Sequence, residues 1–284
     1  MRVPGKRPGE LHHGRGAQRL GRRGDALSEA GEALAFATTL AREAGELLLR
    51  YEPERGALET HAKSTPTDLV SAADRASEAL IRERIELEYP ADAILGEEGA
   101  DRDGSSGRTW VVDPLDGTTN FLFGVPSWAV SIACEDADGP LVGCIVDPKR
   151  NECFTAERGG GAQLNGVPMA VSPRADVSRA LVATGFNYDA KLRRTQAEQL
   201  ARLIGSVRDV RRFGAASLDL AWVACGRFDG FYEAGLGRWD WAAGALLVRE
   251  AGGAVAHVPS PHGGEQLLAT NGALHAELER LVTS

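Results

Sequence analysis

Two aspartates three residues apart, Asp113 and Asp116, are the residues of this chain best suited to carry out chemistry. They follow an apolar run, residues 110–112, that is typical of a buried strand, and they precede Gly117 and Thr118. Carboxylates bind hard cations, and the N–H groups of a glycine turn can hold phosphate. This segment therefore predicts magnesium-assisted chemistry on a phosphorylated substrate.

Further carboxylates stand at predicted strand ends and turns, namely Asp68, Asp74, Glu97, Glu98 and Asp240. Like charges raise one another's pKa and resist desolvation, so such a cluster is costly unless cations offset it. Two alternatives stay open at this point. Asp113 and Asp116 can be ordinary turn residues beside Pro114, and Asp240 can be the N-cap of a helix.

The elements that must position these residues fall into two patterns. Helical spacing of apolar residues predicts helices over 30–51 and 71–88, followed by strands over 93–95, 109–112, 128–135, 141–146 and 152–156. This half is expected to be two helices covering an antiparallel sheet. Strands and helices then alternate over 180–184, 191–204, 207–211, 215–225, 228–232 and 239–251. Alternation favours a layered α/β unit, and we expect a boundary near residue 175.

Composition limits the classes of function. The net charge of −8 gives no case for a nucleic-acid partner, and no apolar stretch is long enough to span a membrane. Residues 1–27 are basic and glycine-rich and are expected to be a disordered tail, although a transit peptide or an interaction arm has the same composition. The four cysteines form no C-x-x-C pair, which indicates reduced core thiols in a cytoplasmic protein. No histidine has metal-ligand spacing.

Four segments together resemble one known family. They are Gly96-Glu97-Glu98, the stretch from Asp113 through Asn120 that reads D-P-L-D-G-T-T-N, Trp239-Asp240-Trp241-Ala242-Ala243-Gly244, and an entry segment over 63–70 that Asp74 follows. They are similar to motifs of the inositol monophosphatase family, within the superfamily of magnesium-dependent, lithium-sensitive sugar-phosphate phosphatases. The resemblance covers residues 30–282 and implies a five-layer α/β/α/β/α sandwich, an antiparallel half before an alternating one, and a homodimer.

The resemblance also implies roles for individual residues. A first Mg²⁺ would be held by Glu97, Asp113 and the carbonyl of Leu115, and a second by Asp113, Asp116 and Asp240, while Glu97 would share a loosely held third ion through water. Thr118, bonded to Asp74, would orient the attacking water, and Asp68 would influence metal release. The substrate would be bound by Asp116, Gly117, Thr118, Gly214, Ala215, Ala216, Glu233 and Asp240. For Glu233 a solvated strand end is an equal alternative.

The resulting expectation is a Mg²⁺-dependent phosphomonoesterase in three parts: the tail at 1–27, a half over 28–175 that carries most metal ligands, and a half over 176–284 that completes the site. Its substrate is expected to be inositol monophosphate or a related polyol phosphate, hydrolysed by in-line attack of water without a covalent intermediate. Histidinol phosphate and fructose 1,6-bisphosphate are the alternatives within the superfamily. The Thr119-Asn120 pair favours the inositol monophosphatase branch, whereas Asn187 departs from the proline usual there.

Overall fold

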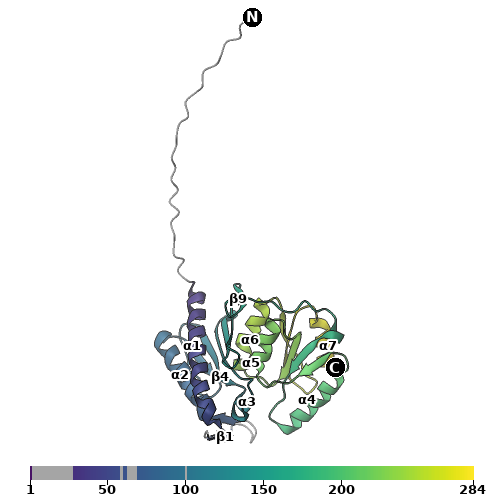
Figure 1. The fold of residues 1–284 in the computed structure, drawn as a ribbon, viewed down its shortest axis with the longest axis horizontal. Coiled ribbons are helices and arrows are strands. Elements are labelled where there is room, and N and C mark those ends of the chain that lie inside the picture. Colours follow the sequence, from purple (N-terminus) through teal and green to yellow (C-terminus); the bar gives the residue numbers. More distant parts are fainter. Residues whose placement is uncertain (2–27, 58–59, 63–68, 100) are drawn as a thin grey trace.

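The computed structural model describes residues 1, 28–57, 60–62, 69–99 and 101–284, so the predicted tail and Asp68 lie outside the described residues apart from Met1. The α-helices are α1 (Glu29–Tyr51), α2 (Ala72–Glu88), α3 (Thr118–Phe123), α4 (Ala190–Leu203), α5 (Ala216–Ala224), α6 (Arg238–Glu250) and α7 (His275–Thr283). Two 3-10 helices lie at η1 (Glu52–Ala57) and η2 (Val177–Arg179). Figure 1 shows these elements as a row of layers.

The first large sheet has seven strands in the order β3-β4-β5-β6-β7-β8-β9. Their bounds are β3 (Ala93–Gly96), β4 (Thr109–Asp116), β5 (Ala129–Asp136), β6 (Gly139–Asp147), β7 (Glu152–Glu157), β8 (Gly161–Leu164) and β9 (Val167–Pro168). Every neighbouring pair is antiparallel except β3 and β4, which are parallel. The expected antiparallel half is therefore confirmed with one parallel strand added at its edge.

The second large sheet has five strands in the order β11-β10-β12-β14-β13. Their bounds are β10 (Leu181–Thr184), β11 (Asp209–Arg211), β12 (Gly230–Ala234), β13 (Ala254–Pro259) and β14 (Glu265–Thr270), and a small separate hairpin pairs β1 (Thr60–Ala62) with β2 (Leu69–Ser71). Strands β10, β11 and β12 are parallel, as expected for α/β alternation, whereas β14 pairs antiparallel with β12 and β13. The predicted boundary near residue 175 falls between β9 and β10.

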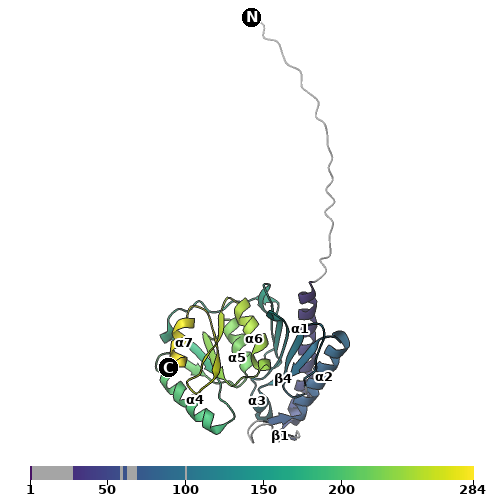
Figure 2. The same cartoon turned by 180° about the vertical axis from the view of Figure 1, so that it is seen from behind.

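Helix α1 illustrates how the sequence produces the outer layer. Ser28 caps its N-terminus by accepting a hydrogen bond from the Gly31 N–H at 3.0 Å. Its buried residues recur at helical spacing on one face and pack on the first sheet; they are Ala33, Ala37, Leu40, Ala41, Ala44 and Leu48. Helix α2 packs beside α1, and the two cover the outer face of that sheet (Figure 2).

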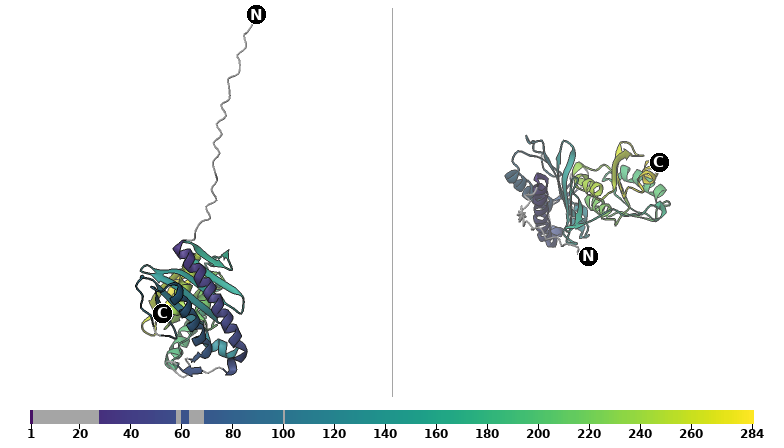
Figure 3. Two further views of the ribbon diagram at one scale, coloured as in Figure 1. Left: turned by 90° about the vertical axis from the view of Figure 1, so that its left-hand side faces the viewer. Right: turned by 90° about the horizontal axis from the view of Figure 1, so that it is seen from above.

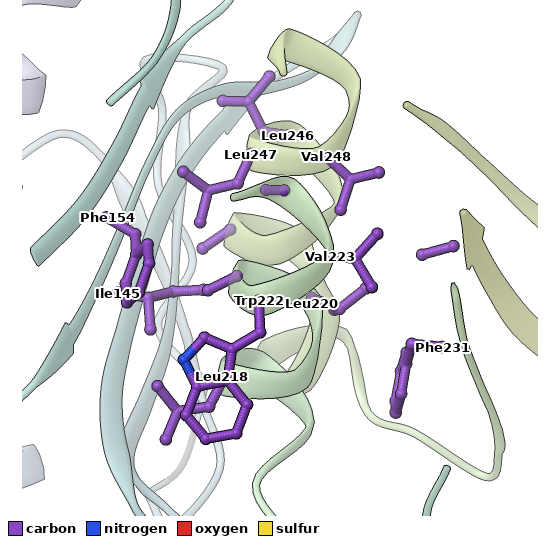
Figure 4. Packing of buried hydrophobic residues seen from close by; sticks show 14 of the residues in the cluster. Ile145, Phe154, Leu218, Leu220, Trp222, Val223, Phe231, Leu246, Leu247 and Val248 are labelled. Carbon is purple, nitrogen blue, oxygen red and sulfur yellow. The ribbon is translucent and has the colours of Figure 1, made fainter. Parts of the chain in front are cut away.

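Helices α5 and α6 form the middle layer between the two large sheets. In Figure 4, Leu218 and Trp222 lie toward Ile145 and Phe154 of the first sheet, while Val223 lies on the side of the second. Helix α5 is buried along its whole length, which explains why its sequence shows no polar face. Helices α4 and α7 cover the far face of the second sheet, so the layers alternate α/β/α/β/α as expected (Figure 3). In the described part of the chain, no helix is long and apolar enough to cross a membrane.

Candidate active site

The acidic residues singled out above meet at a pocket of about 270 Å³ between the two halves of the fold. Glu97 comes from the segment after β3, Asp113 and Asp116 from β4, and Asp240 from the first turn of α6. The expected residues that line the pocket are Glu97, Asp113, Leu115, Asp116, Gly117, Thr118, Gly214, Ala216, Glu233 and Asp240. Asp74 and Ala215 are buried and do not line it.

Asp113 and Asp116 belong to a strand and not to a turn, so that alternative is wrong. They pair with Ser131 and Ala129 of β5, so two residues of β4, Pro114 and Leu115, lie opposite the single residue Val130 of β5. Residues three apart in a regular strand point to opposite faces. The extra residue of this bulge corrects the alternation, so that both carboxylates reach the same pocket.

Pro114 and Leu115 complete this bulge. The Pro114 carbonyl accepts a hydrogen bond from the Ser77 hydroxyl of α2 at 2.9 Å, and the Leu115 N–H donates to the Asp113 carboxylate at 3.1 Å. A bulge leaves backbone groups outside the strand ladder, and here α2 and the Asp113 side chain satisfy two of them. The turn-like composition of the motif therefore reflects a local break in strand pairing.

Thr118 and Asp74 form the hydrogen bond that the resemblance implied. The Thr118 hydroxyl donates to Asp74 Oδ1 at 2.7 Å, and its oxygen also lies 3.2 Å from the Leu115 carbonyl. Asp74 is fully buried, and its Oδ2 accepts hydrogen bonds from the Ser71 N–H at 2.9 Å and from the Ser71 hydroxyl. The Asp74 N–H donates in return to the Ser71 hydroxyl oxygen at 3.4 Å, which completes a capping box at the start of α2. Asp74 is therefore fixed and acts on the pocket through Thr118.

Asp116 joins the two halves of the chain. Its Oδ1 accepts a hydrogen bond from the Ala216 N–H at 3.2 Å, and its Oδ2 accepts from the Ser217 N–H at 2.7 Å and from the Ser217 hydroxyl at 2.5 Å. Helix α5 has no side-chain cap of its own, because its N-cap residue is Ala215. Asp116 therefore supplies the acceptors that the first turn of α5 lacks.

Asp240 is not the N-cap of α6, which corrects the second alternative. Gly237 is the N-cap, and Asp240 lies three residues later, where its Oδ2 accepts a hydrogen bond from the Gly237 N–H at 2.6 Å. This is the carboxylate half of a capping box. The bond holds the Asp240 side chain at the helix start, beside the pocket.

Electrostatics at the pocket are dominated by negative charge. Five carboxylates line it, whereas Arg212 is the one cationic side chain among the described lining residues. Burial, followed by repulsion from neighbouring carboxylates, raises the pKa values of Asp113 and Asp240 well above the ordinary range. Burial also raises the pKa of Asp116 to about 6, against the lowering effect of the Ser217 hydrogen bonds. A cluster of buried carboxyls with raised pKa values is typical of a functional site.

Glu233 is not a solvated strand end. It is partly buried against Gly185, where an added Cβ would lie 1.9 Å from Glu233 Oε2. Burial raises its pKa to about 7, although the nearby Arg212 lowers it. Only a residue without a side chain at position 185 allows the carboxylate to approach the backbone this closely.

Gly117 shows why the glycine of the motif is required. It has a φ of 90°, and an added Cβ would lie 2.9 Å from the Ser127 carbonyl oxygen and 3.3 Å from Ala215. It is also the N-cap of α3, so the unpaired N–H groups at the start of that helix belong to the wall of the pocket.

The donor set fits a hard divalent cation, because it consists of carboxylate oxygens with backbone carbonyls nearby. Glu97 shares a side-chain hydrogen bond with Asp113, so these two carboxyls are close neighbours. Among the described residues, however, no group of three or more His, Cys, Asp or Glu side chains is arranged so that it could hold a metal ion. The individual ligand assignments therefore stay predictions.

Several pocket residues escaped the sequence reasoning. Arg212, Tyr188 and Leu236 line the pocket, although none was assigned a role. Arg212 stands two residues before the Gly214-Ala215-Ala216 segment, but Arg208 and Arg211 lie close to it in sequence, so no signal distinguished it. No histidine occurs among the described lining residues.

Comparison with known proteins gives consistent matches over the folded part of the chain. Residues 29–283 match the inositol monophosphatase family. A Pseudomonas aeruginosa protein named Nus factor SuhB is 45% identical over 81% of this chain and 86% of its own length. The inositol-1-monophosphatase of Rhizobium meliloti is 47% identical over 74% of this chain and 80% of its own. The crystal structure of the extragenic suppressor protein suhB from Bartonella henselae, 38% identical, superposes with a TM-score of 0.83 over 89% of this chain and 99% of that one.

Proposed function

This chain belongs to the inositol monophosphatase family, and on that basis we propose that it is a Mg²⁺-dependent phosphatase that hydrolyses inositol monophosphate or a related polyol phosphate. One observation carries the proposal. Carboxylates from β4, from β12, from the start of α6 and from the segment after β3 line a single pocket beside the Thr118–Asp74 pair. A volume of about 270 Å³ suits one small ester and not a large ligand.

The proposed metal ligands are Glu97, Asp113, Asp116, Asp240 and the Leu115 carbonyl, with two or three Mg²⁺ ions per site. Their oxygen-only chemistry and the raised pKa values of Asp113 and Asp240 support this assignment. When bound, the ions supply positive charge against the phosphoryl oxygens and lower the pKa of a nearby water. Lithium sensitivity is expected from the same family membership.

The proposed role of Thr118 is to orient the attacking water. Its hydroxyl proton is directed to Asp74 at 2.7 Å, which leaves the lone pairs of the same oxygen to accept a hydrogen bond from water. Asp74 is fixed by the start of α2 and is therefore a positioning residue. Water then attacks phosphorus in line with the departing alcohol, and no covalent enzyme intermediate is required.

The proposed substrate contacts come from the starts of α3 and α5 and from Glu233 of β12. The N–H groups at the start of α3, after Gly117, bind the phosphoryl oxygens, and the first turn of α5 at Ala216 meets the polyol ring. Glu233 accepts a hydrogen bond from a substrate hydroxyl, and Arg212 beside it limits the repulsion between that carboxylate and the phosphate. These assignments rest on pocket position and on the family resemblance.

The test is phosphate release from inositol monophosphate as a function of Mg²⁺ concentration. Asp113→Asn removes a carboxylate from the pocket with little change in shape, and we expect activity to fall by about 10³-fold or more with a weaker response to Mg²⁺. Asp138→Asn is the matched control, because Asp138 lies exposed in the hairpin turn between β5 and β6. Full activity of Asp113→Asn would refute the metal assignment.

The substrate class is tested in the same assay with histidinol phosphate and fructose 1,6-bisphosphate beside inositol monophosphate. We expect the highest kcat/KM with inositol monophosphate, since the Thr119-Asn120 pair favours that branch. A clear preference for histidinol phosphate would show that the chain is a histidinol-phosphate phosphatase instead. Light scattering of the purified protein tests the homodimer that the family resemblance implies.

The relatives named Nus factor SuhB favour a second candidate, a Nus factor role for this chain beside hydrolysis. The two roles are separable, because Asp113→Asn removes hydrolysis and leaves the surface unchanged. A transcription assay with wild-type protein and Asp113→Asn decides: equal activity of both supports the second role, and no activity of either excludes it.

A further inference from the structure

A second depression, remote from the acidic pocket, is lined almost entirely by arginines. It has a volume of about 750 Å³ and lies at the beginning of strands β10 and β11, where Leu181 and Asp209 form part of its wall. The arginine cluster, as we call its basic lining, consists of Arg174, Arg179, Arg208, Arg211 and Arg227. Such a concentration of guanidinium groups is unexpected in a chain with a net charge of −8.

The arginine cluster lies at the opposite end of the second sheet from the acidic pocket. Leu181, the first residue of β10, lines the depression, whereas Phe186, two residues past the end of β10, lines the acidic pocket. β12 repeats this order, because Arg227 precedes the strand and Glu233 lies near its end. Four residues of β10 span about 13 Å, so the two sites are separate.

Only part of the positive charge is neutralised. Arg174 pairs with Asp229 at 2.9 Å, Arg211 pairs with Asp209 at 2.7 Å, and Arg227 binds both oxygens of Glu152. These three side chains are held in place by their partners. All five arginines remain solvent-exposed, and all five line the depression.

Arg179 and Arg208 differ from the other three. Within the described part of the chain, neither side chain makes a hydrogen bond or an ion pair. Asp176 interacts electrostatically with Arg179, and Asp209 with Arg208. The Arg208 N–H donates to the Ala180 carbonyl at 3.0 Å, which fixes the backbone at this point. The cluster therefore combines three guanidinium groups that ion pairs hold in place with two whose N–H donors have no partner among the described residues.

We propose that the arginine cluster binds a small anion that carries two or more linked phosphate groups. Each planar guanidinium group can bind a phosphate through two parallel N–H donors. Five such groups around one depression therefore suit a ligand with more than one phosphate. No aromatic side chain occurs among the described lining residues, so the stacking platform of a single-stranded nucleic-acid site is missing. The shape is a local depression and not a track, which favours a compact ligand.

The test is isothermal titration calorimetry of the full chain with inorganic tripolyphosphate. EDTA is present to remove metal from the acidic pocket, so that the carboxylates there repel the probe. Wild-type protein is expected to bind one equivalent, and the double variant R179Q/R208Q is expected to bind at least about tenfold more weakly, as the loss of charge-assisted hydrogen bonds predicts. R179K/R208K keeps the charge without the planar fork and is expected to fall between the two.

The matched control is R193Q/R194Q, which removes two exposed arginines from α4 and changes the net charge equally. It is expected to bind tripolyphosphate like the wild type, and R179Q/R208Q is expected to retain full phosphatase activity and an unchanged melting curve. Absence of binding, or equal weakening by both double variants, overturns the proposal. Binding of single-stranded RNA that depends on Arg179 and Arg208, without binding of tripolyphosphate, also overturns it.

Discussion

Asp219→Asn tests the electrostatics of the middle layer independently of catalysis. Asp219 lies in the first turn of α5, is fully buried, and has an Oδ1 without a hydrogen-bond partner. Burial raises its pKa well above the ordinary value, and Glu233 and Asp116 raise it further, while Arg212 lowers it. We therefore expect the folded protein to hold Asp219 in its protonated form.

The sign of the effect follows from that proton. When the pKa of a carboxyl is higher in the folded protein than in the unfolded chain, the bound proton stabilises the fold. This contribution is complete below the unfolded-state pKa of about 3.9 and is lost as the pH rises through the folded-state pKa. Each pH unit between these two values costs about 1.4 kcal/mol of folding free energy. Asparagine has nearly the same shape and no proton to lose, so Asp219→Asn is expected to gain stability over the wild type as the pH rises.

Urea unfolding in EDTA at a series of pH values from 4.5 to 8 measures this difference. Taking the difference between the two proteins cancels the other buried carboxyls of the pocket, which titrate in both. The free-energy difference should approach the slope of about 1.4 kcal/mol per pH unit and level off above the native pKa. Exposed Asp138→Asn should show no slope. A flat difference, or an Asp219→Asn protein less stable than wild type at pH 7, would show that Asp219 is ionised and paired.

Three further substitutions test the site and the core. Gly185→Ala places a methyl group 1.9 Å from Glu233 Oε2, so the carboxylate must move. KM for inositol monophosphate should rise by about tenfold, with kcat less affected. An unchanged KM would exclude Glu233 from the substrate contacts. Thr118→Ala should lower kcat by about 10²-fold or more, and Thr118→Ser should restore most of it; equal rates for the two exclude a role for the hydroxyl. Leu40→Ala in the buried face of α1 should cost about 2–5 kcal/mol in urea unfolding, whereas Leu87→Ala, exposed on α2, should cost almost nothing.

Sequence reasoning succeeded where a local pattern determines the structure. The apolar spacing of residues 30–51 and 71–88 predicted α1 and α2 within one residue at each end, because burial against one sheet requires that spacing. The Thr118–Asp74 hydrogen bond was also predicted correctly. The cysteines are free as expected, although Cys225 is only partly buried.

The failures lie where the structure depends on a partner distant in sequence. The bulge in β4 is set by its pairing with β5 and by the Ser77 hydrogen bond to Pro114, neither of which is visible in the motif itself. Arg212 has no pattern around it, since its proximity to Glu233 arises from the parallel arrangement of β11, β10 and β12. The N-cap alternative weighed for Asp240 is wrong, because Gly237 occupies that position of α6.

The motif from Asp113 to Asn120 does more than supply charge, because it also holds the two halves of the chain together. Asp116 accepts hydrogen bonds from the first turn of α5, and the Asn120 Nδ2 donates to the Phe213 carbonyl at 2.7 Å and to the Ser127 carbonyl at 2.7 Å. Five of these eight residues line the acidic pocket, and the motif also fixes the segment before α5, where Gly214 lines the same pocket. Since a buried polar contact is lost when its partner moves, the pocket can be complete only when the second half is docked. This dependence explains why the motif is continuous in sequence while the site it builds is assembled from distant segments.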